Sequence, residues 1–502
     1  MPEPTDPSSD PRDGSADAAL PSGDAPPPSG DAAPPSGADL ARRRFFRSFA
    51  GELMTGAATI VGAAQAIQRS SAEVAQTLLG GEPSSRSDGL PAADPPAASA
   101  GSTGAAGSAW PPSAPWPQSA PPAAVYRSAF RWQGDTISVV DQSRLPGAIV
   151  ETSLESADDV VAAIRRGTIV GPEAMAQLGA IGLALSANAR RDAPPGDRPV
   201  AFGVMTSSLA NARPSARSIR SANARMLGRL AALPGGASGP NGDAVADALR
   251  AEAEAIVFDA TDAHGRLVEV GLGALPAPAV GPLQVLVHGA SGALACGQSG
   301  TALGIVLAAH HADRPIHAWV PEARPTFLGS RITAWELENA GVSHTLVVDA
   351  AAGSLLAAGA VDAVLLAGEW VAADGDVVAE IGGFGVAALA ARLRIPVLAC
   401  APLSAFEPDG LAGDVPLGAY DGADVVLPLG RRVAPEGTPA HSPAVEVVPA
   451  ELVDAIVTEE GILRAPFGPA ITAALTRGRA RRVPPPAYPG LVPDADRAMA
   501  GR

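Results

Sequence analysis

The chain has 502 residues, with 36 basic and 52 acidic side chains and a formal net charge of −16. All of these basic residues are arginines, so the sequence excludes a Walker-type phosphate loop, a Schiff-base enzyme and a kinase, each of which needs a lysine. The acidic balance argues against nucleic acid as a partner, because binding to that polyanion depends on cationic side chains. Length alone suggests roughly two or three domains.

The chain holds only two cysteines, Cys296 and Cys400. Two are too few for a disulfide framework or for a zinc site without many other ligands, and they favour a reducing cytoplasm. We interpret both as small buried hydrophobic residues. The seven histidines show no metal-ligand spacing. We therefore expect no metal and no cofactor.

The first 124 residues form a low-complexity region. Residues 1–38 and 82–122 are rich in Pro, Ala, Ser, Gly and Asp, which predicts disorder because such a chain cannot bury enough apolar surface. A short helix is expected near 40–80. There, arginines and phenylalanines at 42–47 precede a mildly apolar stretch at 53–67.

The segment from Arg42 to Ile67 has two interpretations. One is a twin-arginine export signal, which would make the protein secreted. The other is an amphipathic helix that docks on a tether, favoured because Glu52 interrupts the apolar stretch and about forty residues precede the arginines. No stretch reaches the roughly twenty apolar residues that cross a bilayer, so we expect no membrane span and a cytoplasmic protein.

Residues 125–275 are predicted to form a small, mostly helical domain. Ile137, Val139 and Val140 form a short strand-like run. Helical patterns follow over 158–164, 173–185, 215–233 and 243–260, and Ser156 is a candidate N-cap for the first helix.

Residues 276–475 alternate short apolar runs with stretches of helical length, and residues 476–502 are expected to be a tail. The runs lie at 283–288, 316–320, 345–348, 363–367, 397–399 and 425–427. Short runs without polar alternation indicate strands buried on both faces of a parallel sheet. The fold class is therefore α/β, with a helical N-terminal domain and a Rossmann-like, doubly wound C-terminal domain, in which ligands bind beyond the carboxyl ends of the strands.

Polar residues and glycines stand at those strand ends. A glycine-rich turn follows His288 and opens a helix, and Glu369 follows the fourth run. Such a turn suits an anion, but it also serves the tight packing of any strand–helix unit. A lone glutamate at a strand end is either paired with an arginine, solvated or catalytic, and the sequence leaves these alternatives open.

Several longer segments carry a family resemblance. Together they span about residues 128–470 and include 141–147 (DQSRLPG), 211–215 (NARPS), 300–304 (GTALG), 322–325 (EARP), 331–337 (RITAWEL), 401–404 (APLS) and 449–461 (PAELVDAIVTEEG). The chain resembles the S-methyl-5-thioribose-1-phosphate isomerase family, within the superfamily of ribose-1,5-bisphosphate isomerase and the regulatory subunits of eukaryotic initiation factor 2B. The resemblance implies an aldose–ketose isomerase fold, a phosphorylated sugar as ligand and a homodimer formed through the C-terminal domain.

The resemblance also implies site residues, and the chain departs from several of them. The family's catalytic Cys falls on Gly289 and its catalytic Asp falls on Glu369. The family's substrate-binding positions fall on Gly171, Pro172, Arg213, Leu328, Ala379 and Glu380, and among its charged groups only Arg213 keeps its charge. With no thiol and with Glu380 in place of a cation, we expect the ancestral sugar phosphate to bind poorly.

Two functional hypotheses follow from these replacements. The first is an isomerase-family enzyme, an intramolecular oxidoreductase, with an altered substrate or altered chemistry. The second is a non-catalytic protein that binds a metabolite or has a regulatory role, as the resemblance to initiation factor 2B subunits implies, because a fold can persist after its chemistry is lost.

Overall fold

The structure of the chain is a computed structural model that describes residues 128–278 and 280–481. The predicted low-complexity region at 1–124, its helix near 40–80 and the segment from Arg42 to Ile67 lie outside the described residues. So does most of the predicted tail, although its first residues belong to α13 (Phe467–Arg481). Among the described helices, none combines the length and the apolar character that a membrane crossing requires.

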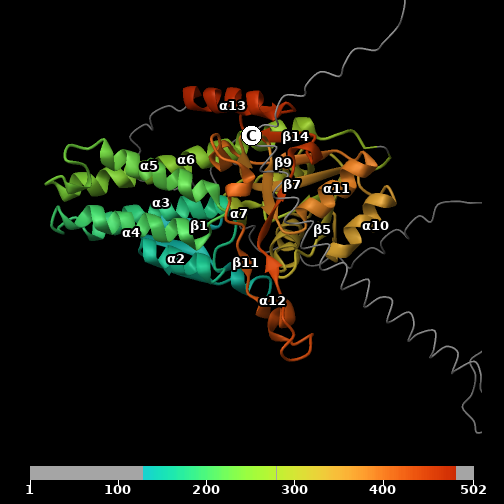
Figure 1. Cartoon of the computed structure of the whole chain (residues 1–502), viewed down its shortest axis with the longest axis horizontal. Helices are drawn as coiled ribbons and strands as arrows, with labels where there is room; N and C mark the ends of the chain where they lie inside the picture. The colour runs from blue at the N-terminus through green and yellow to red at the C-terminus, as the bar shows by residue number, and fades with distance from the viewer. Residues whose placement is uncertain (1–127, 279, 482–502) are drawn as a thin grey trace, which may run out of the picture. The chain divides into compact units, whose positions relative to one another are not determined.

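The described chain begins with a small antiparallel sheet that leads into a group of helices. The strands are β1 (Phe130–Gln133), β2 (Thr136–Val140) and β3 (Glu151–Leu154). The helices are α2 (Ala157–Arg165), α3 (Pro172–Ala189), α4 (Asp197–Ala212), α5 (Arg217–Ala231) and α6 (Gly242–Ala274). Figure 1 shows them side by side, with α3 next to α5 and α6.

The predicted helices of this half are confirmed, with two differences. Ser156 caps α2 as expected, because its hydroxyl accepts a hydrogen bond from the backbone N–H of Asp159 at 3.2 Å. Helix α4 was not predicted, and α6 continues well beyond residue 260. The extension has a clear cause, since the end of α6 packs against the sheet and residues such as Leu267 are fully buried there.

The second half is built on a parallel sheet with strand order β6-β5-β4-β7-β9-β14, to which β15 adds in antiparallel fashion. Numbered along the chain, the six parallel strands follow the order 3-2-1-4-5-6 of doubly wound nucleotide-binding folds. Their bounds are β4 (Leu283–His288), β5 (Ile316–Pro321), β6 (His344–Val347), β7 (Ala363–Ala372), β9 (Val397–Cys400), β14 (Ala455–Thr458) and β15 (Gly461–Leu463).

Helices cover both faces of this sheet. On one face, α10 (Ala352–Ala357), α11 (Gly383–Leu393) and α13 pack against side chains such as Leu286 and Leu366. On the other face, α8 (Ala302–His311), α9 (Ala334–Asn339) and the end of α6 pack against Val285 and Leu365. Strand side chains point alternately to opposite faces of the sheet. Because helices cover both faces, the side chains on both are apolar, which explains why each strand is a continuous apolar run in the sequence. The predicted doubly wound α/β fold is confirmed.

The prediction of a strand at residues 425–427 is wrong. Residues Gly422–Val426 form helix α12, which begins where Asp421 accepts a hydrogen bond from the backbone N–H of Ala423 at 2.9 Å. None of the residues of α12 is buried, whereas a strand of this sheet is buried on both faces. The place in the sheet is taken by β14, within the segment 449–461.

Strand β7 continues beyond the parallel sheet and turns back. Its second half pairs in antiparallel fashion with β8 (Val377–Glu380), and β8 in turn pairs with β13 (Val445–Val448). The pairing of β7 with β8 shifts register between Gly368 and Trp370, which is a β-bulge at Glu369. Bulges redirect a side chain. This hairpin therefore brings Glu369 and Glu380 to the same end of the sheet.

Candidate functional site

A cavity of about 690 Å³ lies at the carboxyl ends of β4 and β7. Strand β4 is the point at which the strand order reverses, with β5 on one side and β7 on the other. In doubly wound sheets this position leaves a crevice that binds ligands. The loops after α2 and α4 close the cavity from the helical half.

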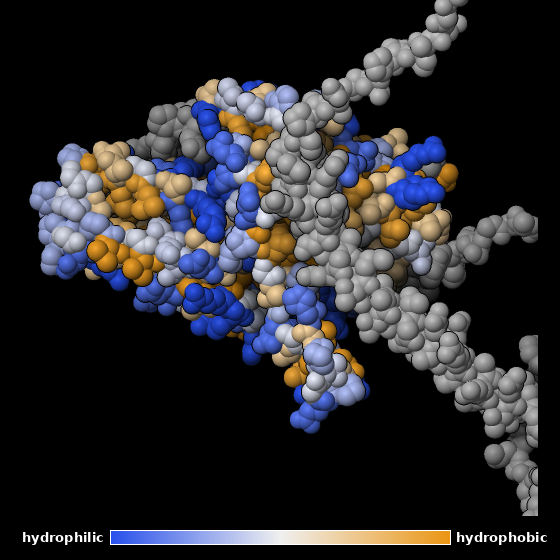
Figure 2. Space-filling model, viewed as in Figure 1, coloured by the Kyte–Doolittle hydropathy of each residue, from blue (hydrophilic) through white to orange (hydrophobic). Residues whose placement is uncertain are grey.

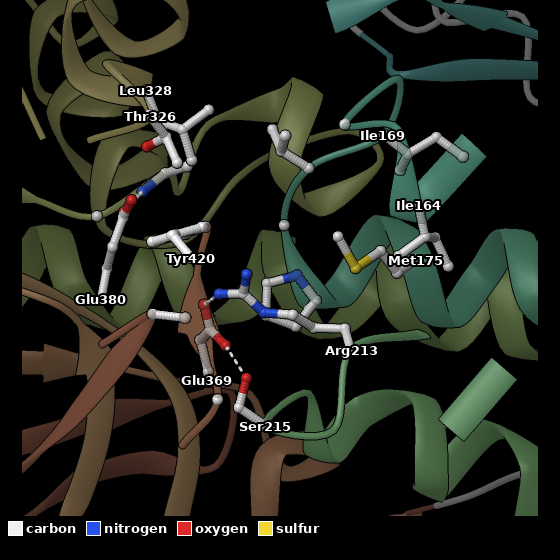
Figure 3. Close-up of a pocket in the computed structure, with 18 of the residues that line it drawn as sticks. Ile164, Ile169, Met175, Arg213, Ser215, Thr326, Leu328, Glu369, Glu380 and Tyr420 are labelled. Carbon is white, nitrogen blue, oxygen red and sulfur yellow. Dashed lines mark hydrogen bonds and ion pairs between the residues drawn. The ribbon is translucent and has the colours of Figure 1, made fainter. Parts of the chain in front are cut away.

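The centre of the cavity is an ion pair between Arg213, at the end of α4, and Glu369 (Figure 3). Arg213 Nη2 donates to Glu369 Oε1 at 2.7 Å, and the hydroxyl of Ser215 donates to Glu369 Oε2 at 3.1 Å. Burial opposes the charge of Arg213, but Glu369 and the hydroxyl of Tyr420 outweigh it and raise the pKa of the guanidinium. The guanidinium of Arg213 and the hydroxyl of Ser215 thus fix the position of the Glu369 carboxyl group.

Tyr420 comes from β11 (Ala419–Tyr420) and closes another side of the cavity. Burial raises its pKa to about 12, with Glu380 and Glu369 adding to the rise and Arg213 opposing it. The phenol is therefore a neutral hydrogen-bonding group near neutral pH.

Glu380, the last residue of β8, is the second carboxyl of the cavity and is only 5% exposed. Its Oε2 accepts a hydrogen bond from the backbone N–H of Ala290 at 3.3 Å. Burial raises its pKa. The nearby Glu369 acts in the same direction, while His288 and Arg213 act against it.

Gly289 lies directly beside this carboxyl. A Cβ atom at position 289 would stand 3.7 Å from Glu380 Oε2 and 3.0 Å from the Cβ of Ala367. The backbone of Gly289 has φ of +89°, which L-residues with a side chain rarely adopt. Glycine at this position thus suits the local backbone and leaves the adjoining space to the carboxyl of Glu380.

The cavity is lined by four arginines, whose guanidinium groups differ in what they contact. Arg213 is paired with Glu369. Arg331 donates to the backbone carbonyls of Gln142 and Leu145, at 2.6 and 3.1 Å, and so ties the segment 142–145 to the helical turn Gly329–Thr333. Arg165 and Arg166, at the end of α2, are exposed, and within residues 128–278 and 280–481 neither forms an ion pair.

Most residues implied by the resemblance meet in this cavity, although the chain places them far apart. The lining includes Gly171, Pro172, Arg213, Gly289, Leu328, Glu369 and Glu380. Ala379 does not line it. Because neighbours along a strand point to opposite faces, Ala379 turns into the core below α11 while Glu380 turns into the cavity.

Both cysteines are buried, as expected. Burial raises the pKa of Cys296, and it raises the pKa of Cys400 to about 12. A buried thiol of raised pKa is a poor nucleophile and a poor source of thiolate. Cys296 borders the cavity, but its sulfur faces the hydroxyl of Thr301 at 3.9 Å.

Sequence reasoning missed the pair Arg165–Arg166, Tyr420 and the lining role of Arg331. The two adjacent arginines at the end of a predicted helix were a visible signal, because that helix precedes the segment of Gly171. Tyr420 gave no signal, since it reaches the cavity from a short strand in a loop region.

This fold and cavity define a doubly wound α/β protein with a cavity at its topological switch point. The model of the Initiation factor 2 subunit family matches residues 171–465, and the chain belongs to that family. It is 38% identical over 346 residues to a methylthioribose-1-phosphate isomerase of Anaeromyxobacter sp. (strain Fw109-5), covering 68% of this chain and 96% of that protein. It is 36% identical over 355 residues to the protein of that name from Desulforudis audaxviator, covering 70% and 98%.

Solved structures agree with this membership. The 5-methylthioribose 1-phosphate isomerase of Pyrococcus horikoshii OT3 superposes with a TM-score of 0.62 at 26% identity, covering 70% of this chain and 96% of that one. The translation initiation factor eIF-2B subunit delta of A. fulgidus superposes with a TM-score of 0.59 at 27% identity, covering 70% and 99%. The similarity thus extends both to proteins named as isomerases and to proteins named as initiation factor subunits.

Proposed function

We propose that the cavity binds a small phosphorylated sugar or a related anionic metabolite. The observation that carries this proposal is the arrangement of cations. Among the described residues neither Arg165 nor Arg166 has an ion-pair partner, and both line a cavity whose centre is the pair Arg213–Glu369. A phosphate dianion needs such groups, because it must exchange its water for charged or polar donors. The names of the relatives from Anaeromyxobacter and Desulforudis support methylthioribose-1-phosphate as the first ligand to test.

The contacts of each arginine indicate which of the four can bind a phosphate. Glu369 neutralises Arg213, and backbone carbonyls already occupy Arg331, so neither has its full donor capacity left for a phosphate. Arg165 and Arg166 have no such partner among the described residues, and the expectation of poor binding from the sequence did not take these two arginines into account. We assign the phosphate to these two residues and the sugar hydroxyls to Arg213, Glu369 and Tyr420.

Calorimetry of the full chain with methylthioribose-1-phosphate tests this assignment. We expect the wild-type chain to bind, and we expect the double variant Arg165→Ala/Arg166→Ala to bind at least about tenfold more weakly, a loss of about 1.4 kcal/mol or more. Arg229→Ala is the matched control, because it removes an exposed arginine from the last turn of α5, outside the cavity. Equal affinity of the double variant and the control would show that the arginines of α2 do not hold the phosphate.

A second candidate function is ligand binding without turnover, as in a regulatory subunit. The absence of a side chain at Gly289 favours it, because the thiol that the resemblance implies cannot be supplied there. Incubation of the purified chain with methylthioribose-1-phosphate separates the two candidates. Turnover that both Glu369→Gln and Arg213→Ala abolish would exclude the non-catalytic candidate.

We further propose that the protein is a cytoplasmic homodimer that does not bind nucleic acid. Support for the dimer comes from apolar side chains at the surface of the sheet half: Leu389, in α11, is 45% exposed and Val348, before α10, is 57% exposed. Figure 2 shows hydrophobic residues among hydrophilic ones on the part of the molecule where Figure 1 labels α10 and α11. A second copy would remove such side chains from water. Sedimentation equilibrium should give twice the chain mass, and Leu389→Glu should shift it toward the monomer.

A further inference from the structure

We propose that Glu369 and Glu380 form an acid–base pair across the cavity, in which Glu369 accepts a proton from the bound sugar and Glu380 donates one to it. This inference rests on the proposed binding of a phosphorylated sugar in the same cavity. The proposal makes Glu380 a catalytic residue, whereas the sequence showed it only as an anion at a position where the family has a cation.

The two carboxyls enter one cavity from neighbouring strands, β7 and β8 (Figure 3). The bulge at Glu369 turns its side chain toward Arg213 and Ser215, which hold it at 2.7 and 3.1 Å. These two donors fix the position of the carboxyl group, and we assign it the role of proton acceptor. Its Oε1 and Oε2 each have capacity for a further hydrogen bond from a substrate hydroxyl.

Glu380 has the opposite environment. Its side chain is 5% exposed, and one backbone donor, the N–H of Ala290, contacts its Oε2 at 3.3 Å. Its titratable and charged neighbours are Glu369, Arg213, His288 and Tyr420. Burial dominates and raises the pKa of Glu380, so the neutral acid persists to a higher pH than in an exposed glutamate.

Two carboxyls in different surroundings within one cavity are the usual basis of an acid–base assignment. Gly289 lies beside this carboxyl and adds no side chain to the cavity. A Cβ there would approach Glu380 Oε2 to 3.7 Å, so a longer side chain at 289 would compete with the carboxyl for the same part of the cavity. The carboxyl of Glu380 thus occupies the place from which a group on residue 289 would act.

The reaction of an aldose 1-phosphate needs one proton donor and one acceptor. Glu380 donates its proton to the ring oxygen while the bond from that oxygen to C1 breaks. The hydrogen on C2 moves to C1 with its electron pair, and Glu369 accepts the proton of the C2 hydroxyl, which leaves a ketone at C2. The sugar is oxidised at C2 and reduced at C1, so no external oxidant is needed, and a proton passing from Glu369 to Glu380 restores the pair.

Turnover of methylthioribose-1-phosphate by the full chain, followed by phosphorus NMR, tests the pair. We compare the wild type with Glu380→Gln and Glu369→Gln, and we use Glu436→Gln as a control that makes the same change at an exposed site outside the cavity. We expect each cavity variant to lose about 100-fold or more of kcat, the usual contribution of general acid or base catalysis, while Glu436→Gln keeps wild-type turnover. Calorimetry should show that Glu380→Gln still binds the compound.

The pH profile of the wild type gives an independent readout that does not depend on the folding of any variant. Because Glu380 acts in its protonated form, kcat should fall as pH rises through its raised pKa. Glu380→Gln turnover within twofold of the wild type would overturn the assignment, as would a wild-type kcat that stays flat to alkaline pH. Wild-type binding without turnover would overturn the pair alone, and failure to bind would overturn the proposed function itself.

Discussion

Replacement of Gly289 by alanine tests whether this position is adapted to glycine. The backbone of Gly289 has φ of +89°, and an alanine Cβ would lie 3.0 Å from the Cβ of Ala367, closer than ordinary van der Waals contact. A left-handed backbone costs a residue with a side chain about 1–2 kcal/mol. We therefore expect Gly289→Ala to lower the free energy of unfolding by about 2 kcal/mol, with the close contact placing it at the upper end of that range.

Urea unfolding followed by circular dichroism measures this loss. Gly228→Ala is a control for which we expect a change of opposite sign in the free energy of unfolding. Gly228 is an exposed residue inside α5, and an added Cβ meets nothing within 4 Å. Alanine there should raise the free energy of unfolding by about 0.5–1 kcal/mol. If Gly289→Ala proved as stable as the wild type, residue 289 would tolerate a side chain, and its glycine would need another explanation.

The remaining predictions concern other parts of the fold. Burial raises the pKa of Glu336 to about 7, because the buried site favours the neutral acid. The fold is therefore most stable with respect to this group below about pH 4, where the carboxyl is neutral in both the folded and the unfolded chain. This stability is lost as pH rises through 7. Glutamine does not titrate, so the free energy of unfolding of Glu336→Gln should rise relative to that of the wild type by roughly 3 kcal/mol between pH 4 and pH 8. Urea unfolding at both pH values measures this change. Ser156→Ala should cost about 1 kcal/mol of unfolding free energy through loss of the α2 cap, and its melting curve would show no shift if the cap were absent in solution. Cys296 and Cys400 should react with a thiol reagent only after denaturant is added, and rapid labelling of the native chain would contradict their burial.

The parallel strands were predictable because each is a short apolar run bounded by breakers and buried on both faces. Leu283–His288 was predicted with the bounds that the structure shows. The same criterion failed at Val425–Leu427, because this short apolar run belongs to the half-buried end of helix α12. Length and composition alone do not separate the two, since burial is decided by the rest of the fold.

A site residue was predictable where it follows an expected strand. It was not predictable where only the tertiary fold places it in the cavity. Glu369 stood at an expected strand end. Glu380 is different: in the sequence it is an anion that replaces a cation, whereas the β7–β8 hairpin places it against the backbone of Ala290 and removes it from water. A charge read from the sequence takes no account of burial, which favours the neutral acid.

The central claim is that the cavity at the ends of β4 and β7 holds a phosphorylated sugar between the arginines of α2 and the two carboxyls. A crystal structure of the chain soaked with methylthioribose-1-phosphate tests it most directly. We predict the phosphate at Arg165 and Arg166, the sugar hydroxyls at Arg213, Glu369 and Tyr420, and the ring oxygen at Glu380. An empty cavity at saturating ligand, or a sugar phosphate bound elsewhere on the molecule, would contradict the account.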